Sequence, residues 1–167
     1  SFGSNHPNIA IRLNNLAVLL KDINRPADAE PLIHRALAIN ETSFGPDHPE
    51  IARNLNNLAR LLHDSNRLTE AEPLMRRALA IDEANFKPDH PNVAIDLNNL
   101  AQLLKATNRL IEAEPLMRRA LAIFIASLGA EHLKTCIVKN NYVRLLTELG
   151  KTENEITAQL NALTGQR

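Results

Sequence analysis

Cysteine, aromatic residues and net charge are scarce in this chain of 167 residues. The one cysteine, Cys136, excludes an internal disulfide framework and is compatible with a reducing compartment. The 19 basic residues equal the 19 acidic ones, so no global field draws the chain to nucleic acid or to an anionic membrane. No apolar run approaches the roughly 18 residues that a membrane-spanning helix needs. We therefore expect a cytoplasmic protein with neither nucleic acid nor membrane as a partner.

Glycine is scarce as well, with 5 in the chain, and no glycine-rich phosphate loop or nucleophile motif is visible. The 44% of hydrophobic and 23% of charged residues are typical of an ordered, helix-rich chain. Because only 3% of the residues are aromatic, we expect aliphatic side chains to fill the core. We expect no enzyme and no cofactor.

What the chain has in abundance is repetition, at a period of 42 residues. The repeated blocks are His6-Pro7, His48-Pro49, His90-Pro91 and the decayed His132-Leu133; Leu13-Asn14-Asn15-Leu16-Ala17 with copies from Leu55 and Leu97; and Ala29-Glu30-Pro31-Leu32 with copies from Ala71 and Ala113. A fixed period in this range indicates a solenoid, in which each repeat buries its apolar face against its neighbours. Such a chain is more often a binding surface than a catalyst.

Each repeat predicts two helices, here called helix A and helix B. In residues 48–89 the apolar stripe of helix A is Ile51, Ala52, Leu55, Leu58, Ala59 and Leu62, and that of helix B is Ala71, Leu74, Met75, Ala78, Leu79 and Ile81. Pro49 suits the first turn of helix A, with Asp47 or His48 as its cap. Thr69 with Glu72 reads as a capping box for helix B.

Helix A is expected to end near Asn66, and the equivalent positions hold Asn24, Asn108 and Gly150. Glycine and asparagine tolerate the left-handed backbone better than other residues, so the chain is predicted to turn at this position in every repeat.

These blocks resemble the tetratricopeptide repeat (TPR), in the long form seen in kinesin light chains and in many bacterial multidomain proteins. The resemblance covers essentially the whole chain and departs from the family pattern at Asn24, Asn66 and Asn108, where glycine is usual. The ordinary repeat has 34 residues, so each repeat here is longer by about two helical turns. The resemblance implies an all-α, right-handed solenoid of four antiparallel helix pairs.

The period also sets the expected domain boundaries. We predict repeats at 6–47, 48–89 and 90–131, a degenerate capping repeat at 132–164 in which polar residues replace apolar ones, and a tail at 165–167. Ser1-Phe2-Gly3 matches Ser43-Phe44-Gly45, so residues 1–5 are expected to be the tail of a truncated upstream repeat. An uncapped end would expose apolar surface between His6 and Ile23, which could drive self-association.

The candidate binding site lies on the face of helix A opposite its apolar stripe, which lines the concave groove in the resembling fold. The candidate residues are Asn15, Arg53, Asn56, Asn57, Arg60, Asn98, Asn99, Gln102, Asn141 and Arg144. Asn15, Asn57, Asn99 and Asn141 share one position of the repeat. A carboxamide offers donors and an acceptor that match an extended peptide backbone.

The resemblance implies peptide contact for Asn57 and Asn99, because an equivalent asparagine touches the bound peptide in chaperone adaptors and in kinesin light chains. The alternative is that the asparagine pairs join neighbouring helices. Arg53 and Arg60 favour an acidic peptide, since arginine binds carboxylates bidentately. Asp22, Asp64 and Glu148 share that face, however, and pairing with them would engage the same arginines.

The sequence predicts neither a metal site nor a nucleophile. The acid-histidine pairs, such as Asp47-His48 and Asp89-His90, lie one repeat apart, so they cannot converge on one ion, and helix capping explains them better. Cys136 lies on the apolar side of its helix and reads as a small packed residue.

The sequence as a whole predicts a non-catalytic module that binds a protein or peptide, as an extended or short helical segment, in the groove lined by helices A. The alternative is a self-assembling scaffold or sensor arm of a larger multidomain protein.

Overall fold

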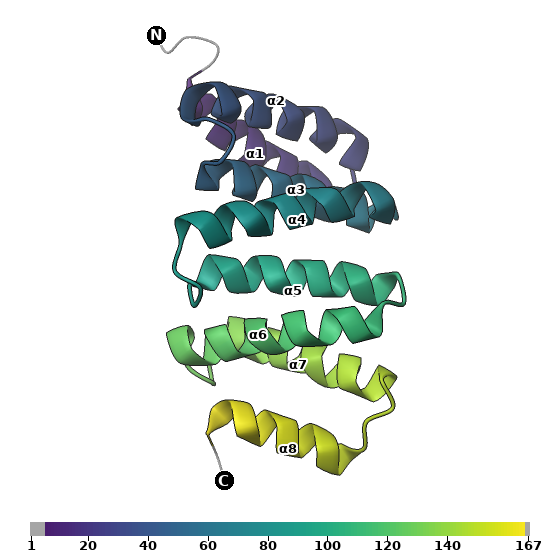
Figure 1. Cartoon of the computed structure of the whole chain (residues 1–167). Coiled ribbons are helices and arrows are strands. Elements are labelled where there is room, and N and C mark those ends of the chain that lie inside the picture. The colour runs from purple at the N-terminus through teal and green to yellow at the C-terminus, as the bar shows by residue number, and fades with distance from the viewer. Residues whose placement is uncertain (1–5, 166–167) are drawn as a thin grey trace. The chain divides into compact units, whose positions relative to one another are not determined.

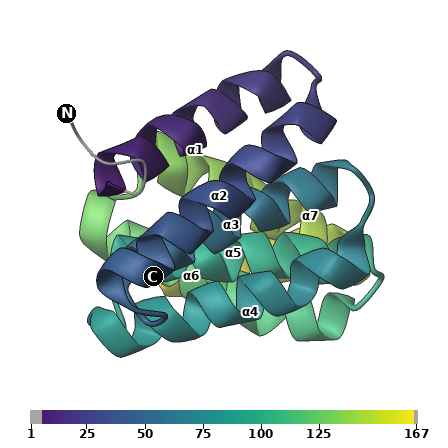
Figure 2. The same cartoon turned by 90° about the horizontal axis from the view of Figure 1, so that it is seen from above.

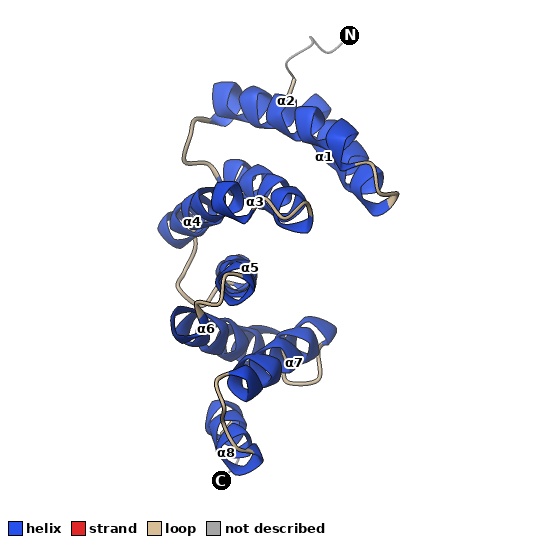
Figure 3. Ribbon diagram, turned by 90° about the vertical axis from the view of Figure 1, so that its right-hand side faces the viewer, coloured by secondary structure: helices blue, strands red, loops and turns tan. Residues whose placement is uncertain are grey.

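The computed structural model describes residues 6–165, and all regular structure in that range is helical (Figure 3). The helices are α1 (Pro7–Asp22), α2 (Pro26–Phe44), α3 (Pro49–Asp64), α4 (Leu68–Asn85), α5 (Pro91–Ala106), α6 (Leu110–Leu128), α7 (Leu133–Glu148) and α8 (Glu153–Thr164). The chain divides into two compact units, with α1 to α4 in unit 1 and α5 to α8 in unit 2. The predicted all-α class is confirmed. The expected tail at 1–5, and residues 166–167 of the tail at 165–167, lie outside the described residues.

Each helix A begins in the same way, at a histidine. His6, His48, His90 and His132 have extended backbone, and Nδ1 of each accepts a hydrogen bond from the backbone N–H two residues later, at 3.1 to 3.2 Å. In α1, α3 and α5 a proline follows the cap, where its missing N–H costs no helical hydrogen bond. The predicted capping role of these histidines is confirmed.

Each helix A also ends in the same way. Asn24, Asn66 and Asn108 have φ near +60°, and Gly150 has φ of +77°. In unit 1 the left-handed residue lets the N–H of Arg67 reach the carbonyl oxygen of Leu62 at 2.8 Å, which satisfies a carbonyl that the helix end would leave unpaired. The predicted left-handed turn is confirmed in all four repeats.

Helix B begins earlier in unit 1 than the sequence suggested. Because α4 starts at Leu68, Thr69 lies inside its first turn and cannot be its N-cap, so the predicted capping box of Thr69 with Glu72 is wrong. A capping box of this type does occur at α8, where Thr152 and Glu155 bond reciprocally. The threonine must precede the helix to serve as a cap, and only in α8 does it do so.

The core of unit 1 lies between the two helices of each pair, which run side by side (Figures 1 and 2). Buried alanines, among them Ala10, Ala36, Ala52 and Ala78, stand where the helices approach one another. Their small side chains let the helix axes come close, while larger aliphatic residues fill the space between them. One such cluster contains Ile51, Ala52, Leu55, Ala78 and Ile81, with Leu37 and Leu74 packed against it.

The core of unit 2 follows the same plan and adds two aromatic rings. Tyr142 of α7 is fully buried and Phe124 of α6 is 2% exposed. The hydroxyl of Tyr142 donates to Oε1 of Glu114 at 2.7 Å and lies 3.1 Å from Oε1 of Gln159 in α8. The last helix, α8, has no fully buried residue in its described length. A helix that covers apolar neighbours on one side only is consistent with the polar end expected of a capping repeat.

Candidate functional site

The first asparagine of the pair in α1 has a structural partner, whereas the second does not. Asn14 is 3% exposed and donates from Nδ2 to Oδ1 of Asn54 in α3 at 2.5 Å. Asn15, one residue later, is exposed. Consecutive helical residues point about 100° apart, so only one member of the pair can face the neighbouring helix. The alternative in which an asparagine joins two helices therefore describes Asn14, and it also describes Asn141 and Asn98 in unit 2.

The second asparagines in the other helices A are half-buried. In unit 2, Asn141 donates from Nδ2 to Oδ1 of Asn98 at 3.3 Å, so the structure brings two of the candidate residues together. This contact uses one of the two N–H groups of Asn141. Within residues 6–165 no further hydrogen bond occupies its other N–H or its oxygen. Asn99 and Gln102 of α5 are half-buried, and so is Asn56 of α3.

The two candidate arginines of α3 differ in their surroundings. Arg53 forms an ion pair with Glu50 one turn earlier in the same helix. Arg60 is exposed and has no ion-pair partner among residues 6–165. Arg144 of α7, two repeats later than Arg60, is also exposed and unpaired in that range. Arg60 in unit 1 and Arg144 in unit 2 are thus candidate residues whose charge has no ionic partner among residues 6–165.

The acidic residues of this face pair with lysines instead of with the arginines. Nζ of Lys21 in α1 lies 3.2 Å from Oδ2 of Asp64 in α3, and Nζ of Lys105 in α5 lies 2.8 Å from Oε1 of Glu148 in α7. The same interhelical ion pair therefore occurs once in each unit. Sequence reasoning missed these lysines, although each lies 43 residues before its acidic partner, one period plus one residue.

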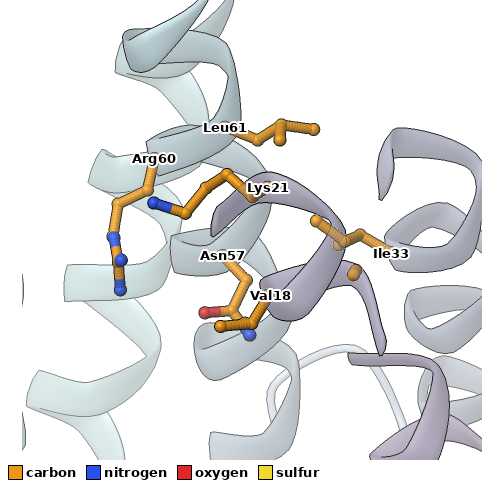
Figure 4. A pocket seen from close by; sticks show the side chains of 7 residues that line it. Val18, Lys21, Ile33, Asn57, Arg60 and Leu61 are labelled. Carbon is orange, nitrogen blue, oxygen red and sulfur yellow. The ribbon is translucent and has the colours of Figure 1, made fainter. Parts of the chain in front are cut away.

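Lys21, Asn57 and Arg60 surround one small hollow in unit 1 (Figure 4). The wall also includes Ala17 and Val18 of α1 and Leu61 of α3. The enclosed space is about 10 Å³, which is room for a single water molecule.

A larger hollow of about 330 Å³ lies between α6, α7 and α8 in unit 2 and contains none of the candidate residues. It is lined by Ile111, Glu114, Arg118, Leu146, Leu149, Lys151 and Gln159. Its charges are already engaged, since Glu114 contacts both Tyr142 and Arg118, and Lys151 lies 3.4 Å from Glu155. It offers a ligand fewer open polar groups than the helix A face does.

No group of His, Cys, Asp and Glu in the described part of the chain could hold a metal ion. Cys136 is half-buried, with Sγ 3.7 Å from the carbonyl oxygen of Ala130. Among residues 6–165 no helix is long and apolar enough to cross a membrane.

The repeated helix pairs and their shared caps define a class of protein. The family model of the tetratricopeptide repeat matches residues 13–84, 67–126 and 97–165, so the chain belongs to the tetratricopeptide repeat family. Repeats of this family generally serve protein–protein interaction as non-catalytic scaffolds. None of the curated proteins compared with the chain matches it.

Among solved structures, the chain is similar to the nearly identical TPR-like repeats of a kinesin light chain from Podospora anserina. The TM-score is 0.84 at 22% identity, over 95% of this chain and 74% of that one. It is also similar to BtubC (BKLC) from P. vanneervenii, with a TM-score of 0.79 at 22% identity, over 96% of this chain and 63% of that one. At this level of identity the likeness shows the fold.

Proposed function

We propose that the chain binds an extended or short helical peptide, without catalysis, in the groove lined by its helices A. Asn57 in unit 1 and Asn141 in unit 2 would bond to the peptide backbone. Arg60 and Arg144, at matching positions of the two units, would each engage an acidic side chain of the peptide. The other candidates on this face would add contacts along its length. These are Asn15, Arg53, Asn56, Asn98, Asn99 and Gln102.

The observation that carries this proposal is the arrangement around Asn57. Lys21 is neutralised by Asp64, whereas Arg60 beside it has no ionic partner in the described residues. An exposed guanidinium next to a half-buried carboxamide presents a fixed fork for a carboxylate and a donor and acceptor for a peptide group. The open cation explains why an acidic peptide suits this surface better than a basic one.

Fluorescence anisotropy with two labelled peptides of equal length tests the proposal. One peptide alternates Ser and Glu, and the other alternates Ser and Lys. The chain should bind the acidic peptide and not the basic one. Equal binding of both would contradict the acidic preference.

Substitutions locate the contact. Arg60→Gln should weaken binding of the acidic peptide by about two- to fivefold, the range for one exposed ion pair. Arg76→Gln is the control, because Arg76 lies in α4, outside the candidate site, and is paired with Glu72. Asn57→Leu should weaken binding by about tenfold through the loss of a backbone hydrogen bond. An unchanged helical circular-dichroism signal in Asn57→Leu is required, since its loss would assign Asn57 a structural role.

A further inference from the structure

The hollow between α6, α7 and α8 in unit 2 lies at a place where unit 1 has an arginine. In unit 1, Nη1 of Arg67, the residue before α4, lies 2.7 Å from Oε2 of Glu30 in α2. Glu114 and Lys151 hold the positions of Glu30 and Arg67 in unit 2. Lys151 pairs with Glu155 of α8 instead, so among residues 6–165 no cation from the start of α8 reaches Glu114.

This difference between the units comes from side chains and not from a neighbouring repeat. Arg67 bonds to Glu30 of α2 and to Glu70 of α4, so the groups that meet at this place in unit 1 all belong to unit 1. The hollow of unit 2 is likewise enclosed by three helices of its own unit. A lysine in place of an arginine therefore leaves the carboxylate of Glu114 without the guanidinium that its counterpart has.

Glu114 can accept further hydrogen bonds although it already has two neighbours. Its Oε1 accepts the hydroxyl proton of Tyr142 at 2.7 Å, and Nε of Arg118 lies 3.6 Å away, beyond hydrogen-bond distance. Within residues 6–165 no hydrogen bond reaches its Oε2. A carboxylate has about four acceptor sites, so Glu114 can bind an additional N–H donor from a ligand.

The cation beside Glu114 does not prevent a second one from binding. The side chain of Arg118 is 57% exposed, so water screens its charge. Unit 1 has the same arrangement, because Nε2 of His34 lies 3.9 Å from Glu30 one helical turn away. Glu30 binds Arg67 in the presence of that neighbour.

The walls of the hollow suit an aliphatic chain that ends in a planar cation. Ile111, Leu146 and Leu149 line it, and the first and last of these replace the smaller Ala27 and Ser65 of unit 1. The volume of about 330 Å³ lies at the lower end of the range for ligand pockets. A guanidinium is less strongly hydrated than an ammonium and can bond to a carboxylate with two N–H groups, so arginine suits these walls better than lysine.

We infer that this hollow binds the side chain of an arginine from a protein partner, whose guanidinium bonds to Glu114 as Arg67 bonds to Glu30 in unit 1. The aliphatic part of that arginine packs against Leu146 and Leu149. The hollow shares no residue with the helix A face and selects a basic residue, whereas the helix A face selects an acidic one. The inference therefore stands or falls separately from the proposed function.

Titration of the chain with N-acetyl-arginine amide, followed by NMR of the ring signals of Tyr142, tests this site. Tyr142 is the only tyrosine and its hydroxyl bonds to Glu114, so its signals respond to a cation placed there. They should shift saturably with a dissociation constant of about 1 mM, the level for a ligand of this size. The citrulline amide, which has nearly the same shape without the charge, and the lysine amide should bind about fivefold more weakly or worse. Equal binding of the citrulline amide would overturn the inference.

Two variants locate the ligand. Glu114→Gln should weaken binding of the arginine amide about tenfold, because it removes the charge that the guanidinium pairs with. Glu30→Gln, the same change at the same repeat position of unit 1, is the matched control and should leave the titration unchanged. Equal weakening by both variants would contradict a site in unit 2.

The second variant, Lys151→Arg, leaves Glu114 and Tyr142 in place. Its own guanidinium should occupy the hollow as Arg67 does in unit 1 and weaken binding of the arginine amide about fivefold or more. This result does not depend on how well Glu114→Gln folds. Wild-type affinity in Lys151→Arg would show that the ligand does not take the place of Arg67, and the inference would be wrong.

Discussion

Units 1 and 2 have the same succession of helices, but α1 of unit 1 and α7 of unit 2 differ in how far their shared helix A positions are buried. Leu19 of α1 is 62% exposed, whereas Leu145, at the same position of the repeat in α7, is fully buried. Unit 2 also places Tyr142 where unit 1 has the smaller Leu58, and the tyrosine hydroxyl reaches Glu114. One repeat pattern therefore yields a packed residue or a surface residue, depending on the neighbours that the fold supplies.

The helix B contacts of the two units differ as well. In unit 1, Arg67 reaches Glu30 of α2 at 2.7 Å and Glu70 of α4 at 2.6 Å. Lys151 holds the position of Arg67 in unit 2, and it pairs with Glu155 of α8. The planar guanidinium can bond to two carboxylates at once, whereas an ammonium acts as a single point charge. Two helices are bridged in unit 1, while the 330 Å³ hollow lies at the corresponding place in unit 2.

The largest expected effect is a difference in stability between variants at Leu145 of α7 and at Leu19 of α1. Leu145→Ala should destabilise the protein by about 2–5 kcal/mol, because it opens a cavity in a packed core. Leu19→Ala, the same change at the same repeat position, should cost less than about 0.5 kcal/mol in dilute solution. Urea denaturation followed by circular dichroism measures both. Equal costs would mean that the two units are covered alike.

A smaller loss of stability is expected when the left-handed residue at the end of a helix A is replaced. Asn66 in unit 1 and Gly150 in unit 2 have positive φ, and no atom lies within 4 Å of the position where a Cβ would stand at Gly150. Asn66→Ala and Gly150→Ala should each cost about 1–2 kcal/mol through backbone strain alone. Asn66→Gly should be close to neutral. The same denaturation curves provide the measurement, and a neutral Gly150→Ala would contradict the strain.

The smallest effect concerns the pKa of Tyr142. Burial, and to a smaller extent the hydrogen bond to Glu114, raises the pKa of this phenol above its ordinary value of 10.0. The folded state therefore holds the proton more tightly. The resulting stabilisation is complete below pH 10 and is lost as the pH rises toward the folded pKa. As Tyr142 is the only tyrosine and the chain has no tryptophan, phenolate absorbance reports it alone.

Glu114→Gln is the control for this titration. It removes the negative charge beside the phenol but leaves the burial, so the midpoint should fall part of the way toward the ordinary value. A wild-type midpoint at or below pH 10 would show that Tyr142 is more accessible to water than its position in the core of unit 2 indicates.

The local features could be predicted because they depend on neighbours in the sequence. The histidine caps and the left-handed Asn66 follow from the side-chain and backbone chemistry of single positions. The start of α4 was misjudged because Thr69 suits a cap chemically, yet the helix begins one residue before it. Helix starts are set by packing as well as by local preference.

Only part of the candidate site could be predicted from the sequence. The row of asparagines was visible from the period, but their division into a buried Asn14 and an exposed Asn15 depends on where α3 lies. The sequence also could not show that Arg53 is occupied by Glu50 while Arg60 has no ionic partner in the described residues. Both arginines have acidic residues within reach along the chain, and side-chain geometry decides which pair forms.

By itself, the sequence determined the repeat and the residues that cap and turn each helix A. These depend on interactions across one to five residues. Tertiary structure decided which Lys pairs with which acid across 43 residues, and it brought the buried Tyr142 of α7 to Glu114 of α6. Burial depends on which helices pack against a residue, so the same residue type at the same repeat position can have different surroundings.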